Sequence, residues 1–143
     1  MTGGFTPSPD YYFLAVWQRL VGARVLDAGV ANAGQDVRVY AFCAHASGGV
    51  ALLAINLKSE RRCVQWGAFE GAAVEAFAFT AGDGAGVESY GARLNGRLLA
   101  LDGSGRLPSL SGAPAEVSNA TVALPPQSAT LFYVPGAAPV ACA

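Results

Sequence analysis

Three cysteines and one histidine are the side chains of this 143-residue sequence best suited to bind a metal or act as nucleophiles. Cys43, Cys63 and Cys142 lack CxxC spacing, and with His45 as the single histidine a tetrahedral zinc site has too few convincing ligands. Three cysteines allow three single-disulfide pairings, and sequence alone does not choose among them. Two arginines before Cys63 would favour a reactive thiolate, but a half-buried strand cysteine is the better interpretation. We expect no metal and no cofactor.

Carboxylates are the second group that could do chemistry. Acid–base catalysis by a carboxylate pair, as in the hydrolysis of a glycosidic bond, requires two carboxyl groups about 5–10 Å apart across a cleft. Most acidic residues here lie beside Gly, Ala or Ser in turn-like contexts, where solvated carboxylates are expected. No pair stands out, and spacing places no nucleophile beside His45, so we predict no catalytic residue. The ten acidic residues are Asp10, Asp27, Asp36, Glu60, Glu70, Glu75, Asp83, Glu88, Asp102 and Glu116.

Aromatic side chains and short motifs give weaker signals. Trp66, Tyr90 and Tyr133 are candidates for a platform on which sugar rings stack, although aromatic residues at strand spacing more often belong to a core. The Gly-rich segments 82–86 and 103–105 neither precede a helix nor contain the lysine of a phosphate-binding loop, so we interpret them as turns. Asn119-Ala-Thr121 is an N-glycosylation sequon, which has meaning only in a secreted protein, and it makes Asn119 a candidate glycosylation site.

Charge and hydropathy exclude some classes of partner. The formal net charge is −1 and no basic cluster exceeds the pair Arg61–Arg62, so nucleic acid is not an expected partner. Residues 117–143 carry no charge, but prolines interrupt them, and no apolar run approaches the ~20 residues of a membrane-spanning helix. Met1 is followed by Thr-Gly-Gly rather than by a basic and then an apolar segment, so no signal peptide is predicted. Either the protein is cytosolic or its true N-terminus lies upstream.

The first element predicted to position these residues is a helix. Ser8 or Asp10 is available to cap its first turn. Apolar residues then cover most of a three-turn helix over Asp10–Val21, and Gly22 is predicted to end it in the left-handed conformation. The apolar residues reach too far round for a helix that covers a single sheet face. We therefore expect some of the side chains of Leu14, Trp17 and Val21 to need a partner other than the sheet.

After residue 22 the hydrophobic period changes to two, which predicts strands. Gly49–Lys58 is almost wholly apolar, as a central strand covered on both faces would be, and Asn95-Gly96 predicts a two-residue hairpin turn. One helix followed by about eight to ten short strands predicts a mainly β fold, an antiparallel β-sandwich. The expected strands are Arg24–Val30, Asp36–Ala46, Gly49–Lys58, Arg61–Gly67, Val74–Thr80, Tyr90–Leu94, Arg97–Leu101, Val122–Leu124 and Ala129–Val134.

Several of these segments carry a family resemblance. The segment Thr6–Gly22 enters with Pro-Asp-Tyr and leaves with Leu-Val-Gly, and it is followed in order by Val37–Cys43, Gly49–Leu57, Leu94–Gly96, Leu107–Leu110 and Pro139–Ala143. Together they resemble the C-terminal region of heparanase-like proteins, glycoside hydrolase family 79. The first segment is similar to the last barrel helix of that family. The resemblance covers nearly the whole chain, and its ending looks most like the plant members.

The resemblance implies a secreted two-domain parent. In it a (β/α)₈ barrel carries a C-terminal β-sandwich and cleaves glucuronide-containing glycans by a retaining mechanism with two glutamates. Residues 1–22 would then be the last helix of the catalytic barrel, and residues 23–143 the sandwich domain. The family's acid/base glutamate follows an asparagine, and none of the glutamates here does, so no catalytic role is carried over.

Two further features follow from the resemblance alone. The family's disulfide maps onto Cys43 and Cys142, which leaves Cys63 as an additional thiol. In one member of the family a strand of the sandwich comes from the N-terminal part of the chain, so an open sheet edge is expected here.

The leading hypothesis is a non-catalytic accessory domain that packs on the barrel and supports its fold and the rim of its cleft. The chain alone is then expected to be inactive. The alternative is a stand-alone carbohydrate-binding or structural β-sandwich, and an enzyme in its own right is least favoured because the acid pair is missing. The expected partners are the barrel and a glycan. The expected location is extracellular, with peripheral attachment to a membrane or the cell wall as a further expectation.

Overall fold

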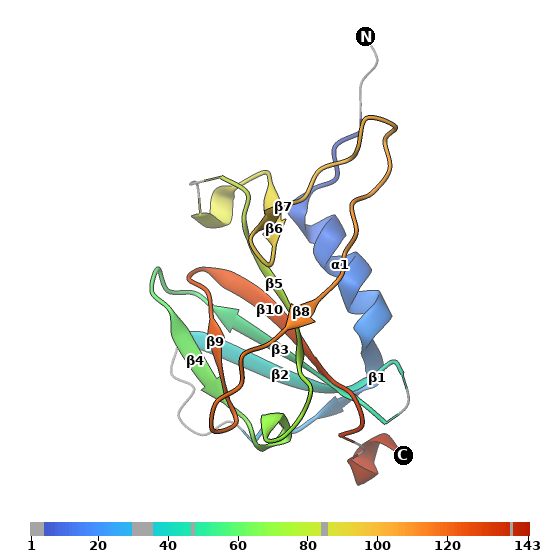
Figure 1. The fold of residues 1–143 in the computed structure, drawn as a ribbon, viewed down its shortest axis with the longest axis vertical. Helices are drawn as coiled ribbons and strands as arrows, with labels where there is room; N and C mark the ends of the chain where they lie inside the picture. The colour runs from blue at the N-terminus through green and yellow to red at the C-terminus, as the bar shows by residue number, and fades with distance from the viewer. Residues whose placement is uncertain (1–4, 30–35, 47, 84–85, 138) are drawn as a thin grey trace.

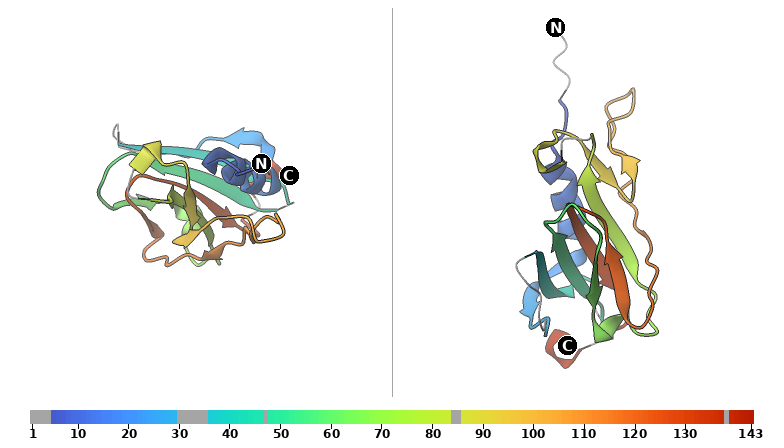
Figure 2. Two further views of the ribbon diagram at one scale, coloured as in Figure 1. Left: turned by 90° about the horizontal axis from the view of Figure 1, so that it is seen from above. Right: turned by 90° about the vertical axis from the view of Figure 1, so that its left-hand side faces the viewer.

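The computed structural model describes residues 5–29, 36–46, 48–83, 86–137 and 139–143, and these form one α-helix followed by short strands (Figure 1). The helix α1 spans Pro9–Leu20. The strands are β1 (Val21–Leu26), β2 (Val37–Ala44), β3 (Val50–Asn56), β4 (Arg62–Gln65), β5 (Glu75–Ala81), β6 (Ala92–Leu94), β7 (Arg97–Leu98), β8 (Ala113–Pro114), β9 (Thr121–Leu124) and β10 (Ser128–Val134). Short 3₁₀ turns are η1 (Gly67–Phe69), η2 (Gly86–Glu88) and η3 (Val140–Cys142). The start of α1 and η3 lie toward opposite ends of the long axis (Figures 1 and 2).

The strands form two antiparallel sheets of unequal size. The larger sheet has the order β1-β2-β3-β10-β5-β6-β7, with β8 paired to β5, and the smaller sheet consists of β4 and β9. The late strand β10 therefore lies inside the larger sheet, where it pairs with β3 along one edge and with β5 along the other. The prediction of a mainly β, antiparallel sandwich preceded by one helix is confirmed.

Each face of the larger sheet supports its own core. In β3, Ala51 and Leu53 belong to the cluster that contains α1, whereas Val50, Leu52 and Ala54 belong to the cluster under the smaller sheet. All five are buried. The nearly continuous apolar run of this strand therefore reflects burial on both faces, as the sequence predicted.

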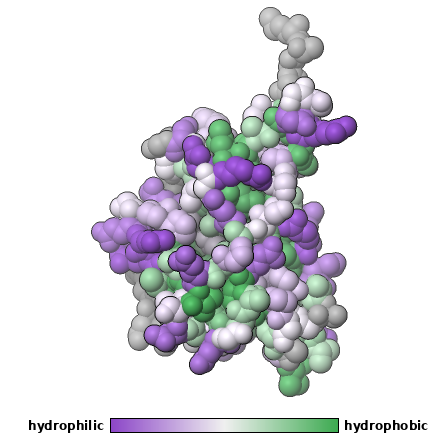
Figure 3. Space-filling model, viewed as in Figure 1, coloured by the Kyte–Doolittle hydropathy of each residue, from purple (hydrophilic) through white to green (hydrophobic). Residues whose placement is uncertain are grey.

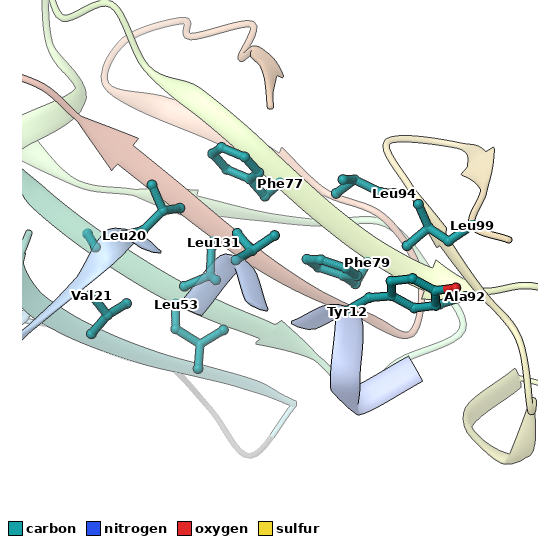
Figure 4. Packing of buried hydrophobic residues seen from close by; sticks show 12 residues of the cluster. Tyr12, Leu20, Val21, Leu53, Phe77, Phe79, Ala92, Leu94, Leu99 and Leu131 are labelled. Carbon is teal, nitrogen blue, oxygen red and sulfur yellow. The ribbon is translucent and has the colours of Figure 1, made fainter. Parts of the chain in front are cut away.

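The helix packs on one face of the larger sheet through a single stripe. Tyr12, Val16 and Leu20 recur every four residues and are buried in that core. Figure 4 shows Tyr12 beside Phe79 of β5 and Leu20 near Leu131 of β10, so the stripe spans both strands. The helix and the strands therefore share one core in this structure.

The three helix side chains from which unpartnered residues were expected have different surroundings. Leu14 is 51% exposed, as expected. Trp17 is part-buried, with its ring centroid 5.0 Å from that of Phe42 on β2, and Val21 is buried. Val21 therefore finds its partner in the sheet. The division of the chain at residue 22 into a barrel helix and a sandwich stays a prediction.

The predicted helix end at Gly22 is wrong. The helix ends at Leu20, and Val21 already has extended backbone, with φ −95° and ψ 122°. Gly22 lies inside β1, where a Cβ atom would come within 2.8 Å of the Cys43 carbonyl oxygen. This glycine therefore permits close approach of β1 to β2 and does not form a left-handed turn.

The predicted hairpin at Asn95-Gly96 is confirmed. It joins β6 to β7, and both residues have positive φ, 49° and 82°. The Asn95 side chain also bonds to the neighbouring strand: its amide oxygen accepts from the Ala78 N–H, and its amide nitrogen donates to the Ala76 carbonyl oxygen, each at 2.9 Å. The turn thus fastens the hairpin to β5.

Two features of the sheets concern their edges. The two-residue β8 was not predicted, because a pair that contains proline shows no alternation from which a strand can be read. In the described part of the chain the smaller sheet has only β4 and β9, so each of these strands has one unpaired edge. Whether one of these edges is the place of a strand supplied by another part of a longer protein stays a prediction.

Candidate functional site

A disulfide joins Cys43 of β2 to Cys142 of η3, which lie 99 residues apart in sequence. Arg24 of β1 also holds the chain end, because its Nη1 donates to the carbonyl oxygens of Ala141 and Ala143 at 2.8 and 3.3 Å. The disulfide is the pairing that the family resemblance implied. It ties the C-terminal turn to the larger sheet and leaves no thiol at either position for chemistry.

The other two residues with reactive side chains lie apart from each other. Cys63 lies on the strand β4, directly opposite Ala123 of β9, but it is exposed, so the expectation of a half-buried cysteine is wrong. His45 is exposed just beyond β2, and its backbone N–H donates to the Leu20 carbonyl oxygen at 2.8 Å. Among the described residues no three His, Cys, Asp or Glu side chains gather as metal ligands would.

The three aromatic residues considered as a sugar platform do not come together. Trp66 packs into the core between the two sheets, with its ring centroid 5.3 Å from that of Phe69. Tyr133 packs on the opposite face of the larger sheet, beside α1. Tyr90 is 93% exposed in the loop between η2 and β6. A joint platform of these residues is therefore ruled out by their positions.

The carboxylates with resolved partners mostly stabilise turns or pair with surface cations. Asp102 accepts from the backbone N–H groups of Ser104 and Arg106 at 2.8 and 2.9 Å. Asp36 forms an ion pair with Lys58 at 3.3 Å. Such exposed pairs contribute little to stability, typically about 0–1 kcal/mol. Neither arrangement resembles an acid–base pair across a cleft.

Two side chains at the start of α1 have shifted pKa values. The hydroxyl of Ser8 donates to the Asp10 carboxylate and holds the pKa of this carboxyl below its ordinary value. Ser8 occupies the N-cap position, but its side chain makes no cap to the backbone. Burial raises the pKa of the Tyr12 phenol. Asp10 is therefore ionised at neutral pH and is poorly suited to donate a proton as a general acid.

Asn119 lies at the tip of a tight turn. Ser118 and Thr121 exchange two backbone hydrogen bonds of 3.0 and 2.9 Å, and Asn119 between them has a φ of 49°. Its side chain is exposed. This position gives a modifying enzyme access to the asparagine.

Exposed large apolar side chains gather on the side of the larger sheet that carries α1. Tyr11 and Leu14 are exposed on the outer helix face, and Val25, Tyr40 and Leu57 are exposed on or next to β1, β2 and β3. We call these five residues the helix-side surface. Exposed apolar residues grouped in this way commonly mark an interaction site.

The strand register places the sheet residues of this surface on the same side as the helix. Val25 lies opposite Phe42, and Tyr40 lies opposite Leu53. Phe42 and Leu53 both pack in the core that contains α1, and directly paired residues share a face. By contrast, on the face seen in Figure 3, which carries β8, apolar areas are broken up by polar side chains.

A cavity of about 340 Å³ opens beside the start of α1 and joins the helix-side surface. Phe13, Ile55, Leu57 and Phe79 contribute apolar wall, and Asp10 lines it with a charged group. This volume falls within the range of about 300–1,000 Å³ that is usual for ligand pockets. A side chain or a small apolar group would fit there.

A second hollow, of about 320 Å³, lies on the other flank of α1. The sheet residues of this hollow come from β10 and β5, whereas those of the helix-side surface come from β1, β2 and the end of β3, on the other side in the strand order. We call it the Arg19 groove. Sequence reasoning missed it, because its lining residues are far apart in the chain and share no spacing. They are Arg19, Leu20, Ala46, Glu75, Phe77, Ser111 and Tyr133.

Similarity to known proteins points to one family. Baicalin-β-D-glucuronidase of Scutellaria baicalensis is 33% identical over 138 residues, which cover 94% of this chain and 25% of the relative. Heparanase of Gallus gallus is 31% identical over 151 residues, which cover 97% of this chain and 28% of the relative. The chain thus spans about a quarter of the length of these curated relatives. No protein-family model matches it.

A solved structure shares the fold at low sequence identity. The endoxylanase of glycoside hydrolase family 30 from Clostridium papyrosolvens C71 superposes with a TM-score of 0.51 over 89% of this chain and 28% of that one, at 17% identity. This likeness concerns the fold alone. The sequence matches, which extend over almost the whole chain, make it a glycosidase-related domain that corresponds to the C-terminal region of heparanase-like proteins of glycoside hydrolase family 79.

Proposed function

We propose that this chain is the non-catalytic C-terminal accessory domain of a secreted, retaining glycoside hydrolase of the β-glucuronidase type, which acts on glucuronide-containing glycans or proteoglycans. The helix-side surface is the observation that carries the proposal, because its exposed apolar residues suit a partner domain. The chain covers only 25% and 28% of the two relatives described above, so proteins of this kind extend well beyond it. Their names, a glucuronidase and a heparanase, support the class of reaction.

The partner we propose for the helix-side surface is the catalytic barrel of the same protein. Burying an exposed Leu or similar side chain contributes about 1.5–3 kcal/mol, so a few residues such as Tyr11, Leu14 and Tyr40 are enough to orient one domain on another. The cavity beside the start of α1 would receive a side chain from the barrel. The sandwich would then support the barrel and the rim of its cleft.

An extracellular location is also part of the proposal. The Cys43–Cys142 disulfide supports it, because disulfides persist in oxidising compartments and are rare in the cytosol. A peripheral association with a membrane or the cell wall would be compatible with such a location. In the described part of the chain no helix is long and apolar enough to cross a bilayer.

Asn119 is expected to carry an N-glycan when the protein passes through the secretory pathway, because it is exposed at a turn and Thr121 completes the sequon. Removal of N-glycans by a glycosidase should change the mass of the peptide that contains Asn119. Asn95 is the matched control: it is also exposed in a turn with positive φ, but no sequon follows it. An Asn119 peptide of unmodified mass would count against both the site and the secretory route.

The experiment on function compares this chain alone with a longer protein that carries the barrel upstream. The isolated chain is expected to release no product from an aryl β-glucuronide, because no acid–nucleophile pair was identified in it. The longer protein should hydrolyse the same substrate. Turnover by the isolated chain that disappears when one of its own carboxylates is changed would contradict an accessory role.

Leu14→Asp tests the docking surface within the same experiment. In the longer protein this change should lower the thermal midpoint, since the barrel contact loses the roughly 1.5–3 kcal/mol of one buried leucine. In the isolated chain the loss should be smaller, within about 1 kcal/mol, because Leu14 is 51% exposed there and aspartate is only a somewhat poorer helix former than leucine. Leu107→Asp is the matched control, since Leu107 is 47% exposed but lies outside the helix-side surface. Equal effects of the two changes in the longer protein, or a coding sequence with no barrel upstream, would favour the stand-alone module instead.

A further inference from the structure

The Arg19 groove holds an arginine whose orientation is fixed by two contacts. The Arg19 guanidinium lies over the Phe77 ring, 5.4 Å from its centroid, and Nη2 donates to the Leu110 carbonyl oxygen at 2.6 Å. Stacking and a hydrogen bond together hold the plane of the guanidinium. Arginine has five N–H donors, so most remain available after the bond to Leu110. A planar fork of this kind is suited to a carboxylate, which it can bind with two parallel hydrogen bonds.

A carboxylate and a phenol complete the groove. Glu75 of β5 and Tyr133 of β10 are directly paired across the sheet. Two glycines make room for them: a Cβ atom at Gly112 would lie 2.6 Å from Oε1 of Glu75, and a Cβ atom at Gly49 would lie 2.7 Å from the Tyr133 ring. Within the part of the chain that the structure describes, no cation pairs with Glu75. Its oxygens are therefore available as acceptors.

These groups match an acidic sugar better than a neutral one. The apolar faces of Phe77 and Tyr133 suit the C–H face of a sugar ring, and Glu75 and the Ser111 hydroxyl can bond to its hydroxyl groups. A carboxylate on the sugar would pair with the Arg19 fork in a charge-assisted contact, which a neutral sugar cannot form. We propose that the Arg19 groove binds a uronic acid unit of an acidic oligosaccharide, with the uronate carboxylate on Arg19.

The groove lies wholly on this domain, because all of its lining residues belong to the described chain. Glu75 of β5 and Tyr133 of β10 lie on the other flank of α1 from Val25 of β1 and Tyr40 of β2. A barrel docked over β1 and β2 would therefore leave the groove accessible. The groove would hold a second part of the same glycan, away from the bond that is cleaved. This proposal rests on the proposed function, and it adds a binding site for the same class of ligand on this domain.

The test is a titration of the isotope-labelled chain, followed by NMR, with methyl β-D-glucuronide and with methyl β-D-glucoside. The two sugars have the same ring and differ in the carboxylate. The glucuronide should shift the backbone amide signals of Glu75, Ser111 and Tyr133 and bind about tenfold or more tightly than the glucoside, as a charge-assisted contact would give. Equal binding of the two sugars, no binding, or signal shifts confined to residues outside the groove would overturn the proposal.

Variants assign the contacts. Arg19→Gln should abolish the preference for the glucuronide. Glu75→Gln should weaken binding of the neutral glucoside, because a charged acceptor for its hydroxyl groups is replaced by a neutral one. The controls Arg106→Gln and Glu116→Gln, which lie outside the groove, should leave both affinities unchanged. Because Arg19 also packs on Phe77, the Arg19→Gln variant could be too unstable to test, and Arg19→Lys then replaces it. Lysine keeps the positive charge but lacks the planar fork, so the preference for the glucuronide over the glucoside should fall.

The outcome is independent of the test of the proposed function. The titration uses the isolated chain and measures no turnover. Binding of the glucuronide together with an inactive longer protein would overturn the proposed function and leave the groove assigned. Hydrolysis by the longer protein without binding in the groove would support the proposed function and overturn the groove assignment.

Discussion

Replacing Phe132 with alanine is expected to lower the free energy of unfolding by about 3–5 kcal/mol. The side chain is 1% exposed in the core between the two sheets, and its ring centroid lies 5.4 Å from that of Phe69. Because β10 is paired on both edges, its backbone cannot move in to fill the cavity that the ring would leave. Urea unfolding of both chains, followed by tryptophan fluorescence, measures the difference.

Tyr90→Ala is the matched control for this experiment. It also removes one aromatic ring, but from a side chain that is 93% exposed. Its effect should stay within about 0.5 kcal/mol. Equal losses from the two changes would show that the core between the sheets contributes less than the structure indicates.

A chain with serine in place of both Cys43 and Cys142 should be less stable by up to about 4.7 kcal/mol. The disulfide closes a loop with a sequence separation of 99 residues, and loops of that length restrict the unfolded chain strongly. The figure is an upper value, because chain entropy alone sets it and real disulfides often contribute less. Urea unfolding under non-reducing conditions gives the difference.

Cys63→Ser controls for the loss of a thiol, and because Cys63 is exposed its effect should stay within about 0.5 kcal/mol. Peptide mapping without reduction should recover the Cys43 and Cys142 peptides as one linked species. A bridge that contains Cys63 would contradict the pairing.

The strands and turns could be predicted where burial or backbone conformation restricts the types of consecutive residues. Gly49–Lys58 is apolar because β3 is covered on both faces, and Asn95-Gly96 fits a turn that demands two positive φ angles. The function of Gly22 was not predictable, since its need for space arises from the Cys43 carbonyl on another strand. A local pattern cannot distinguish a glycine that turns the chain from one that lets two strands approach.

The candidate surfaces were predictable only in part. The excess of apolar residues around the helix pointed to a second partner, and Leu14 is indeed exposed on its outer face. The Arg19 groove left no signal, because Arg19, Glu75 and Tyr133 meet only through the strand order of the larger sheet. The predicted sugar platform of Trp66, Tyr90 and Tyr133 was wrong for the same reason. Spacing along the chain does not show on which face of the sheet each aromatic residue lies after the strands have paired out of sequence order.

The position of β10 also constrains how the protein can be made. Among the described residues, β3 and β5 are joined in the sheet only through residues 128–134, so the middle of the larger sheet cannot form until these late residues have left the ribosome. Earlier strands must wait with unpaired edges, a state in which chains are prone to aggregate. A premature stop codon before residue 128 would therefore remove the centre of the sheet rather than shorten its edge, and the truncated product would be a substrate for degradation.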